Sequence, residues 1–284
     1  MSSRFTQQEY DSFRGFLENA CGIVLGDNKQ YLISSRLTAL LTEYRIPSLG
    51  ALVERLRREH NSPLYERIVD AMTTNETLWF RDGFPFEILR QVILPEHAKA
   101  RAPGVRIWSA ACSSGQEPYS ISMCVEEYLR ANPGALPVNS VQIVATDLSP
   151  SMLEAARAGS YDGAAMARGM GDERKRLFFL HRHGRWEIRD EIKRRVSFRE
   201  LNLLQSYEPL GRFQMIFCRN VLIYFSVDLK RDILARLAGA LQPGGYLFLG
   251  AAEAITGYSD AFDMVRLPQG IVYRLKRSEP EVRY

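Results

Sequence analysis

Three polar side chains follow apolar, strand-like runs of the sequence: Glu117, Asp147 and Asn202. The carboxyl ends of parallel strands meet at one edge of a sheet, and ligands bind there. A carboxylate can accept hydrogen bonds from an amine or from the two hydroxyls of a ribose, and an asparagine beside backbone groups can read the edge of an adenine. These residue types therefore predict a site for a nucleotide-like ligand.

The turn that precedes Glu117 indicates which ligand is expected. Residues 109–115 are Ser, Ala, Ala, Cys, Ser, Ser and Gly, and a helical pattern starts near Pro118. Small side chains let a ligand lie against the backbone, with amide groups pointing at it. A single glycine instead of GxGxxG fits a pyrophosphate poorly, whereas the acidic lining fits the sulfonium and amino group of S-adenosylmethionine (SAM). A plain strand-to-helix turn is the alternative interpretation.

Asp147 has two interpretations of its own. It could bind ribose hydroxyls, or it could cap the helix expected after Pro150. It follows the first strand by about 40 residues, rather than the usual ~20. The spacing alone therefore favours neither interpretation.

The composition sets limits on the class of protein. The chain has 284 residues with 46% hydrophobic residues and a net charge of +4, which suits one large domain and a smaller one. Mild basicity does not argue for nucleic acid. The four cysteines have no metal-like spacing, and the His181–His183 pair lacks a nearby third ligand. A polar N-terminus and the lack of an apolar run of ~18 residues predict a cytoplasmic protein without membrane insertion.

Residues 5–72 predict a bundle of short helices. Thr6 with Glu9 has the spacing of a capping box. The helical stripe of residues 31–44 places Arg36 on the outside. Basic residues on such a face are either solvated or form a docking face for an acidic partner helix.

The segment 73–82, TTNETLWFRD, breaks the helical period. In it Asn75, Thr77 and Arg81 alternate with apolar residues and could face one ligand. A connector that only caps and packs is the other interpretation.

An α/β pattern follows from Phe84. A helix over 86–99 contains Pro95, which predicts a kink or a restart. Period-two stretches around Gly184 predict a small antiparallel insertion with a hairpin. Residues 241–250 predict a PGG turn and a buried strand, and two final strands form a hairpin over 262–277. A sheet that ends in this way is typical of SAM-dependent methyltransferases.

Taken together, these motifs resemble the chemotaxis receptor methyltransferase (CheR) family. The matching stretches are TTNETLWFR, WSAACSSGQEPYS, ATDLS, NLL, FCRNVLIYF and LQPGGYLFLG, which run in family order over nearly the whole chain. The resemblance implies a Rossmann-like SAM-dependent methyltransferase sheet with a small antiparallel β insertion, preceded by a small all-helical N-terminal domain. The expected boundaries are 1–72 for the helical domain, 73–88 for a linker, 89–278 for the methyltransferase domain with its β subdomain at about 170–200, and 279–284 for a tail.

The resemblance also implies methylation of glutamate side chains on membrane chemoreceptors, with S-adenosylhomocysteine (SAH) as the second product. It places SAM contacts at nine positions: Asn75, Thr77, Arg81, Glu117, Asp147, Asn202, Leu203, Arg219 and Asn220. An ionised glutamate is already a nucleophile at neutral pH, so no general base is required. We expect Tyr224 to orient the substrate carboxylate, the alternative being a core aromatic.

The helical domain is then expected to dock on the helical bundle of receptors at the membrane, with the protein itself a monomer. The helix around Arg36 is less basic than the enteric members lead us to expect. The insertion around Gly184 is short, which argues against a tether to a receptor's C-terminal pentapeptide. A methyltransferase of RNA or a small molecule, and a SAM-sensing adaptor without turnover, are the competing functions.

Overall fold

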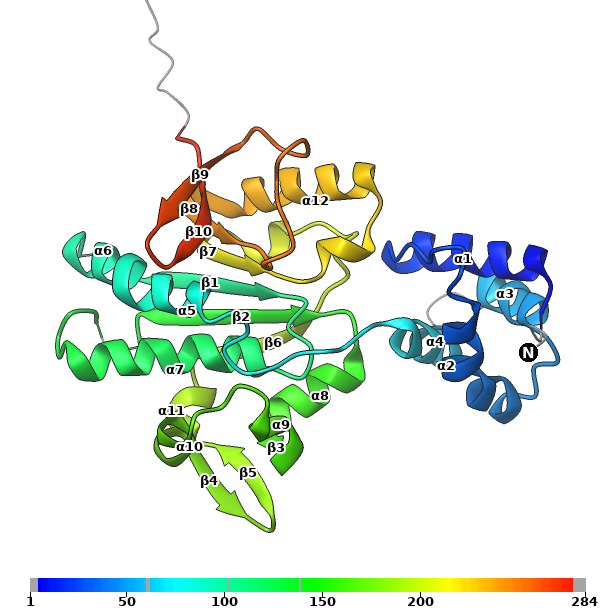
Figure 1. Ribbon diagram of the computed structural model, residues 1–284, viewed down its shortest axis with the longest axis horizontal. Helices are drawn as coiled ribbons and strands as arrows, with labels where there is room; N and C mark the ends of the chain where they lie inside the picture. Colours follow the sequence, from blue (N-terminus) through cyan, green and yellow to red (C-terminus); the bar gives the residue numbers. More distant parts are fainter. Residues whose placement is uncertain (1–4, 60–61, 102, 138, 278–284) are drawn as a thin grey trace, which may run out of the picture.

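The computed structural model describes residues 5–59, 62–101, 103–137 and 139–277. A helical domain lies beside an α/β domain, and a single extended segment joins the two (Figure 1). The expected tail at 279–284 and the first four residues lie outside the described residues. No helix in the described ranges is long and apolar enough to cross a membrane.

The helical domain is built on its own apolar core. Its described helices are α1 Gln7–Cys21, α2 Gln30–Glu43, α3 Leu49–Arg58 and α4 Pro63–Met72. The capping box predicted at the start of α1 is present, because the Thr6 hydroxyl accepts from the Glu9 amide and the Glu9 carboxylate accepts from the Thr6 amide at 2.8 Å. Tyr10, Phe13 and Leu17 of α1 are fully buried in the core.

The α/β domain contains a seven-stranded sheet in the order β6-β2-β1-β7-β8-β10-β9. Strands β6, β2, β1, β7 and β8 are parallel, and β10 runs antiparallel to both β8 and β9. The chain leaves β1 first toward one edge and later toward the other, so a switch point lies between β1 and β7. The strands are β1 Val105–Ala110, β2 Val141–Asp147, β6 Val196–Glu200, β7 Phe213–Cys218, β8 Leu241–Phe248, β9 Phe262–Leu267 and β10 Gly270–Leu275.

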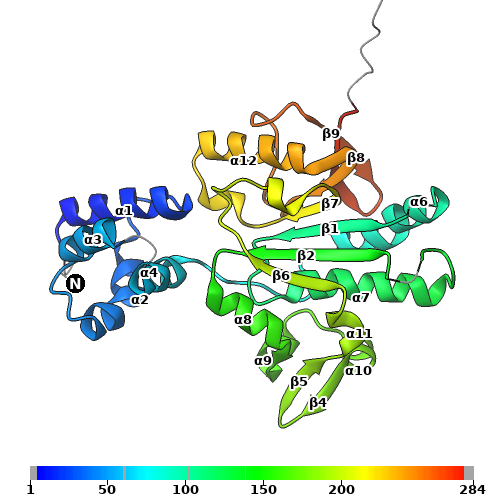
Figure 2. The same cartoon turned by 180° about the vertical axis from the view of Figure 1, so that it is seen from behind.

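Helices cover both faces of this sheet. Alternate strand residues point to opposite faces, so Ile107 packs with the helices before β1 and with α7, while Trp108 packs with α12. The carboxyl ends of β1 and β2 point toward the helical domain in both views (Figures 1 and 2). The covering helices are α5 Phe84–Ile88, η1 Leu89–Ile93, α6 Leu94–Lys99, α7 Gln116–Ala131 and α12 Val227–Ala240; α8 Pro150–Ala158 follows β2, and the short turns η2 Glu208–Leu210 and η3 Leu222–Tyr224 flank β7.

The predicted antiparallel insertion is present as a sheet in the order β3-β5-β4. Its hairpin turns at His183 and Gly184, which both have positive φ. The sheet already begins at Ser160, because a two-residue strand after α8 pairs with β5. Its elements are β3 Ser160–Tyr161, α9 Gly163–Ala167, α10 Asp172–Phe178, β4 Phe179–Arg182, β5 Arg185–Ile188 and α11 Asp190–Lys193.

The structure contains both irregularities predicted from the sequence, the interrupted helix at Pro95 and the PGG turn. The helix that contains Pro95 is interrupted as expected, and the break is a π-helical turn, Leu89–Ile93, just before the proline. This wider turn suits a ring that cannot continue an α-helical hydrogen bond. The predicted PGG turn lies inside β8, where the pairing with β7 shifts register between Phe213 and Met215.

The extended segment between the domains packs against the antiparallel insertion through Trp79. The Trp79 ring packs edge-on against Tyr161 and Phe179, and its amide donates to the Arg168 carbonyl at 3.0 Å. Trp79 is fully buried. The polar residues on either side of it are therefore fixed in position.

Candidate cofactor-binding site

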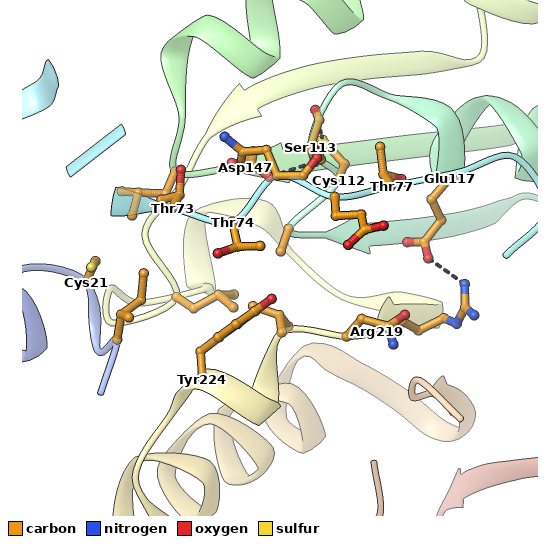
Figure 3. Close-up of a pocket in the computed structure, with 18 of the residues that line it drawn as sticks. Cys21, Thr73, Thr74, Thr77, Cys112, Ser113, Glu117, Asp147, Arg219 and Tyr224 are labelled. Carbon is orange, nitrogen blue, oxygen red and sulfur yellow. Dashed lines mark hydrogen bonds and ion pairs between the residues drawn. The ribbon is translucent and has the colours of Figure 1, made fainter. Parts of the chain in front are cut away.

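A cavity lies at the carboxyl edge of the sheet, where ligands bind in open α/β folds. Figure 3 shows side chains from the helical domain, the connecting segment and the sheet edge directed into it. The structure brings to this cavity all ten residues singled out from the sequence: Asn75, Thr77, Arg81, Glu117, Asp147, Asn202, Leu203, Arg219, Asn220 and Tyr224.

The small-residue turn after β1 forms a tight floor for the cavity. Ala111, Ser113 and Gly115 all have positive φ, so the backbone winds sharply before α7 begins. A Cβ on Gly115 would lie 2.9 Å from the Ala156 Cβ, so only glycine fits there. The Tyr161 hydroxyl of the insertion donates to the Ser114 carbonyl at 2.7 Å and supports the turn from outside.

Asp147, at the end of the neighbouring strand β2, binds the turn that forms the floor of the cavity. Its carboxylate accepts from the Ser113 amide at 2.7 Å and from the Ser149 amide at 2.9 Å. Burial raises the pKa of this carboxyl group, while the two amides oppose the shift. Helix α8 is capped by the Ser149 hydroxyl instead. The capping interpretation of Asp147 is therefore wrong, and the carboxylate keeps lone pairs for a ligand's hydroxyls.

Glu117 and Arg219 meet across the switch point between β1 and β7. The Glu117 carboxylate accepts from the Ser109 hydroxyl at 2.8 Å and from the Arg219 guanidinium at 2.9 Å. Arg219 also donates to Asp82 at 2.7 Å and to the Arg81 carbonyl at 2.8 Å, and only 1% of its side chain is exposed. Both terminal nitrogens of Arg219 thus donate to protein acceptors, and the side chain holds Glu117 in place.

The connecting segment forms the roof of the cavity. The Ser113 hydroxyl donates to the Asn75 carbonyl at 2.9 Å, which ties the roof to the floor. The Phe80 amide donates to the Ser120 hydroxyl at 3.2 Å. Arg81 donates to the Glu76 carbonyl at 3.2 Å, so its position is set within the segment itself.

The helical domain supplies part of the wall, which the sequence pattern did not predict. Cys21 and Ile23, at the end of α1, line the cavity. The Asn202 amide group donates to the Ala20 carbonyl at 2.7 Å, so this predicted site residue also joins the two domains. Because the contacts span about 180 positions, no local pattern could have revealed them.

Arg36 differs from its prediction. It was expected on the outside of α2, but it is half-buried and donates to the carbonyls of Met72 and Thr73 at 2.8 and 3.0 Å. It also donates to the Thr74 hydroxyl at 3.3 Å. Arg36 therefore fixes the start of the connecting segment, because the carbonyls at the end of α4 need donors.

Glu253 is a second residue that sequence reasoning missed. Its carboxylate accepts from the amides of Asn220, Gly250 and Ile223 at 2.6, 2.8 and 3.3 Å. Asn220 has positive φ, so the turn after β7 needs such support. Glu253 thereby holds the turn that carries Asn220 and Tyr224.

The chemistry available in the cavity is limited by what is ionised there. Burial raises the pKa of the Cys21 thiol to about 11 and that of Cys112 well above its usual value, so both stay protonated at neutral pH. In the described ranges the cavity lining includes no histidine, and no cluster of acidic, histidine or cysteine side chains could hold a metal ion. The His181 ring packs at a tilt against the ring of Trp186, with the centroids 4.4 Å apart. The site is suited to binding and alignment.

A parallel sheet that ends in an antiparallel hairpin, with a buried carboxylate at the end of its second strand, defines the class of SAM-dependent methyltransferases. Comparison with known proteins agrees with this class. Residues 8–73 match the all-alpha domain of CheR methyltransferases, and residues 75–271 match their SAM binding domain. The chain belongs to the CheR family of methyltransferases, and its cofactor is SAM.

Relatives align along nearly the full length of the chain. A chemotaxis protein methyltransferase 1 from Pseudomonas aeruginosa is 58% identical over 270 residues, which cover 94% of this chain and 98% of that protein. The chemotaxis protein methyltransferase 1 of Vibrio cholerae is 53% identical over 95% of this chain and 98% of its own. The chemotaxis protein methyltransferase of Escherichia coli is 34% identical over 82% and 79%, respectively. These names support SAM-dependent methylation in chemotaxis.

Proposed function

We propose that this protein transfers the methyl group of SAM to glutamate side-chain carboxylates of membrane chemoreceptors, giving glutamate methyl esters. The observation that carries the proposal is a cavity suited to SAM whose acids, among the described residues, already accept hydrogen bonds from the protein: Glu117 and Glu76 from arginines, and Asp147 from two backbone amides. Glu117 is paired with Arg219, and both thiols are protonated. A carboxylate nucleophile, with an unperturbed pKa of about 4.3, requires no base.

The sulfonium of bound SAM supplies an activated methyl group, so that a carbon–oxygen bond forms as the carbon–sulfur bond breaks and the electron pair stays on sulfur. No proton moves in this step. The task of the protein is alignment, with the carboxylate oxygen within about 3 Å of the methyl carbon and in line with sulfur. Opposite charges are neutralised as the bond forms, so a strongly polar pocket would favour the reactants. The apolar Ile23 and Leu203 beside the polar groups suit this requirement.

The residues of the cavity divide between the parts of the cofactor. Asp147 would accept from the ribose hydroxyls, and the loop at Asn202 and Leu203 would lie along the adenine. Glu117 would accept from the amino group, and Arg81 would balance the cofactor's carboxylate. Asn75, Thr77 and Asn220 would add further polar contacts from the roof and from the turn after β7.

Tyr224 is placed to orient the substrate. Its ring extends from η3 into the cavity with the hydroxyl directed inward (Figure 3). We expect Tyr224→Phe to lower kcat by roughly tenfold with the Kd of SAH unchanged, since one hydrogen bond to a charged group is worth about 1.5–3 kcal/mol. Turnover at saturating receptor and SAH calorimetry check this result. Unchanged turnover would remove Tyr224 from the mechanism.

The product of the reaction tests the proposed function. Purified protein is incubated with methyl-labelled SAM and receptor-containing membranes, and the washed product is treated with alkali. Volatile labelled methanol is expected, because a carboxyl methyl ester is hydrolysed by base. Label that resists alkali would indicate a methylated amine or RNA, and no transfer at all would indicate a SAM-sensing adaptor.

The same proposal assigns docking on the cytoplasmic helical bundle of the receptor to the helical domain. The protein would act as a monomer at receptor arrays, without nucleic acid and without a pentapeptide tether. Calorimetry with a receptor's C-terminal peptide would test the last point directly.

A further inference from the structure

We propose that Asp70 of the helical domain is a positioning residue for the cofactor site, because it holds the segment that carries Asp147. This inference concerns cofactor binding and does not depend on the identity of the methyl acceptor. It gives the helical domain a role beyond partner docking.

The end of β2 and the start of α8, residues 147–151, form one of the places where the two domains meet. The Asp70 carboxylate accepts from the hydroxyls of Ser149 and Ser151, the latter at 2.9 Å. Between Asp147 and Ser149, Leu148 packs against the apolar core of the helical domain. Both Asp147 and Leu148 line the cavity. The helical domain thus contacts the cofactor site through polar and apolar groups at once.

Ser149 connects Asp70 to the predicted ribose carboxylate. Its hydroxyl donates to Asp70 and caps α8 by accepting from the Met152 amide at 3.1 Å. Its own amide donates to the Asp147 carboxylate at 2.9 Å. Ser149 is fully buried, so its orientation is fixed by these partners. A shift of Asp70 would therefore move a direct partner of Asp147.

The position of Asp70 in its helix supports a role outside the helix. Asp70 lies in the last turn of α4, which ends at Met72. A negative charge at the C-terminal end of a helix is unfavourable, because the helix dipole is negative there. A residue that breaks a local rule in this way commonly serves a contact elsewhere. Here that contact is the pair of serine hydroxyls on the other domain.

Two further hydrogen bonds, on the opposite side of the cavity, fix the position of the helical domain relative to the α/β domain. The Val24 amide donates to the Tyr224 carbonyl at 2.9 Å, and Asn202 donates to the Ala20 carbonyl. The cavity is therefore flanked by two contacts that both involve the helical domain. By linkage, any partner that moves this domain alters the affinity for the cofactor, and the cofactor alters the affinity for that partner by the same factor.

The test compares SAH affinity by calorimetry in the full chain. We expect Asp70→Ala to weaken SAH binding by about tenfold or more, since two hydroxyl partners lose their charged acceptor. Asp70→Asn should weaken it less, because its side-chain oxygen can still accept one hydroxyl. Glu66→Ala is the matched control, since Glu66 is an exposed acid on the same helix. It should leave the affinity unchanged.

Two further measurements separate positioning from mere stability. Raised KM for SAM with a smaller change in kcat is expected for Asp70→Asn, whose circular dichroism should match the parent. Asp70→Ala combined with Ser149→Ala should bind SAH no more weakly than the worse single variant, because the two residues act along one path. Parental affinity in folded Asp70→Ala and Asp70→Asn, or effects of Asp70 and Ser149 that simply add, would overturn the proposal.

Discussion

Asp147→Asn is expected to reduce the affinity for SAH by about 100-fold or more. Two ribose hydroxyls would each donate to a charged acceptor, and such bonds are worth about 1.5–3 kcal/mol apiece. Asp147 is 7% exposed, and its carboxylate is already oriented by the amides of Ser113 and Ser149. The side-chain NH2 group of an asparagine would face the backbone N–H of Ser113 or of Ser149, so that two donors would meet. Calorimetric titration with SAH measures the loss.

The matched control for this variant is Asp162→Asn. Asp162 also accepts a backbone amide with its carboxylate, from Ala165 at 2.8 Å, but it caps α9 in the insertion and does not line the cavity. Its replacement should leave SAH affinity unchanged. If both variants bind SAH like the parent protein, Asp147 only supports the turn after β1, and the ribose lies elsewhere.

The order of the motifs was sufficient to predict the α/β domain, because each signal is local. The run at 105–110 reads as a strand, the small residues after it read as a turn, and the hairpin at Gly184 follows from period-two stretches. The residues at the ends of successive parallel strands then had to converge on one edge. Local chemistry and topology therefore predict that Glu117 and Asp147 share one cavity, and the family resemblance adds Arg219.

The parts of the site that the sequence did not predict depend on contacts between segments far apart in the chain. The sequence shows that α1 is amphipathic, but not that its end at Cys21 and Ile23 faces a cofactor cavity. Arg36 reads as a surface residue because helical periodicity counts only its own helix, whereas the carbonyls it binds lie 36 and 37 residues away. Asp70 and Glu253 have no motif, since an isolated acid has no local signature of the amide or hydroxyl it accepts.

The charged residues around Arg219 contribute both to the cofactor site and to the stability of the fold. Glu117 faces the cavity, but its geometry depends on Arg219, which in turn depends on Asp82 in the connecting segment. The cluster thus joins β7, α7 and the roof of the cavity. A substitution that removes the cation affects the fold as well as the site. The free energy of unfolding is therefore a more direct measure of its effect than cofactor affinity.

Arg219→Met is expected to destabilise the protein by about 3–5 kcal/mol, because removing one partner of a buried ion pair leaves the others uncompensated. Glu117 and Asp82 are 13% and 27% exposed, so water could solvate them only in part. The free energy of unfolding in urea measures the loss. Adding Glu117→Gln to Arg219→Met should restore part of it, since one unpaired charge is then removed.

Arg130→Met is the matched control, because Arg130 also contacts two carboxylates, Glu126 at 2.8 Å and Glu191 at 3.1 Å. Its side chain is 46% exposed, and exposed ion pairs are worth at most about 1 kcal/mol. Equal losses for the two arginines would show that burial does not govern the strength of the Arg219 cluster. A large loss for Arg219 alone, partly restored by Glu117→Gln, would establish that the buried cation at the switch point stabilises the fold by compensating the charges of Glu117 and Asp82.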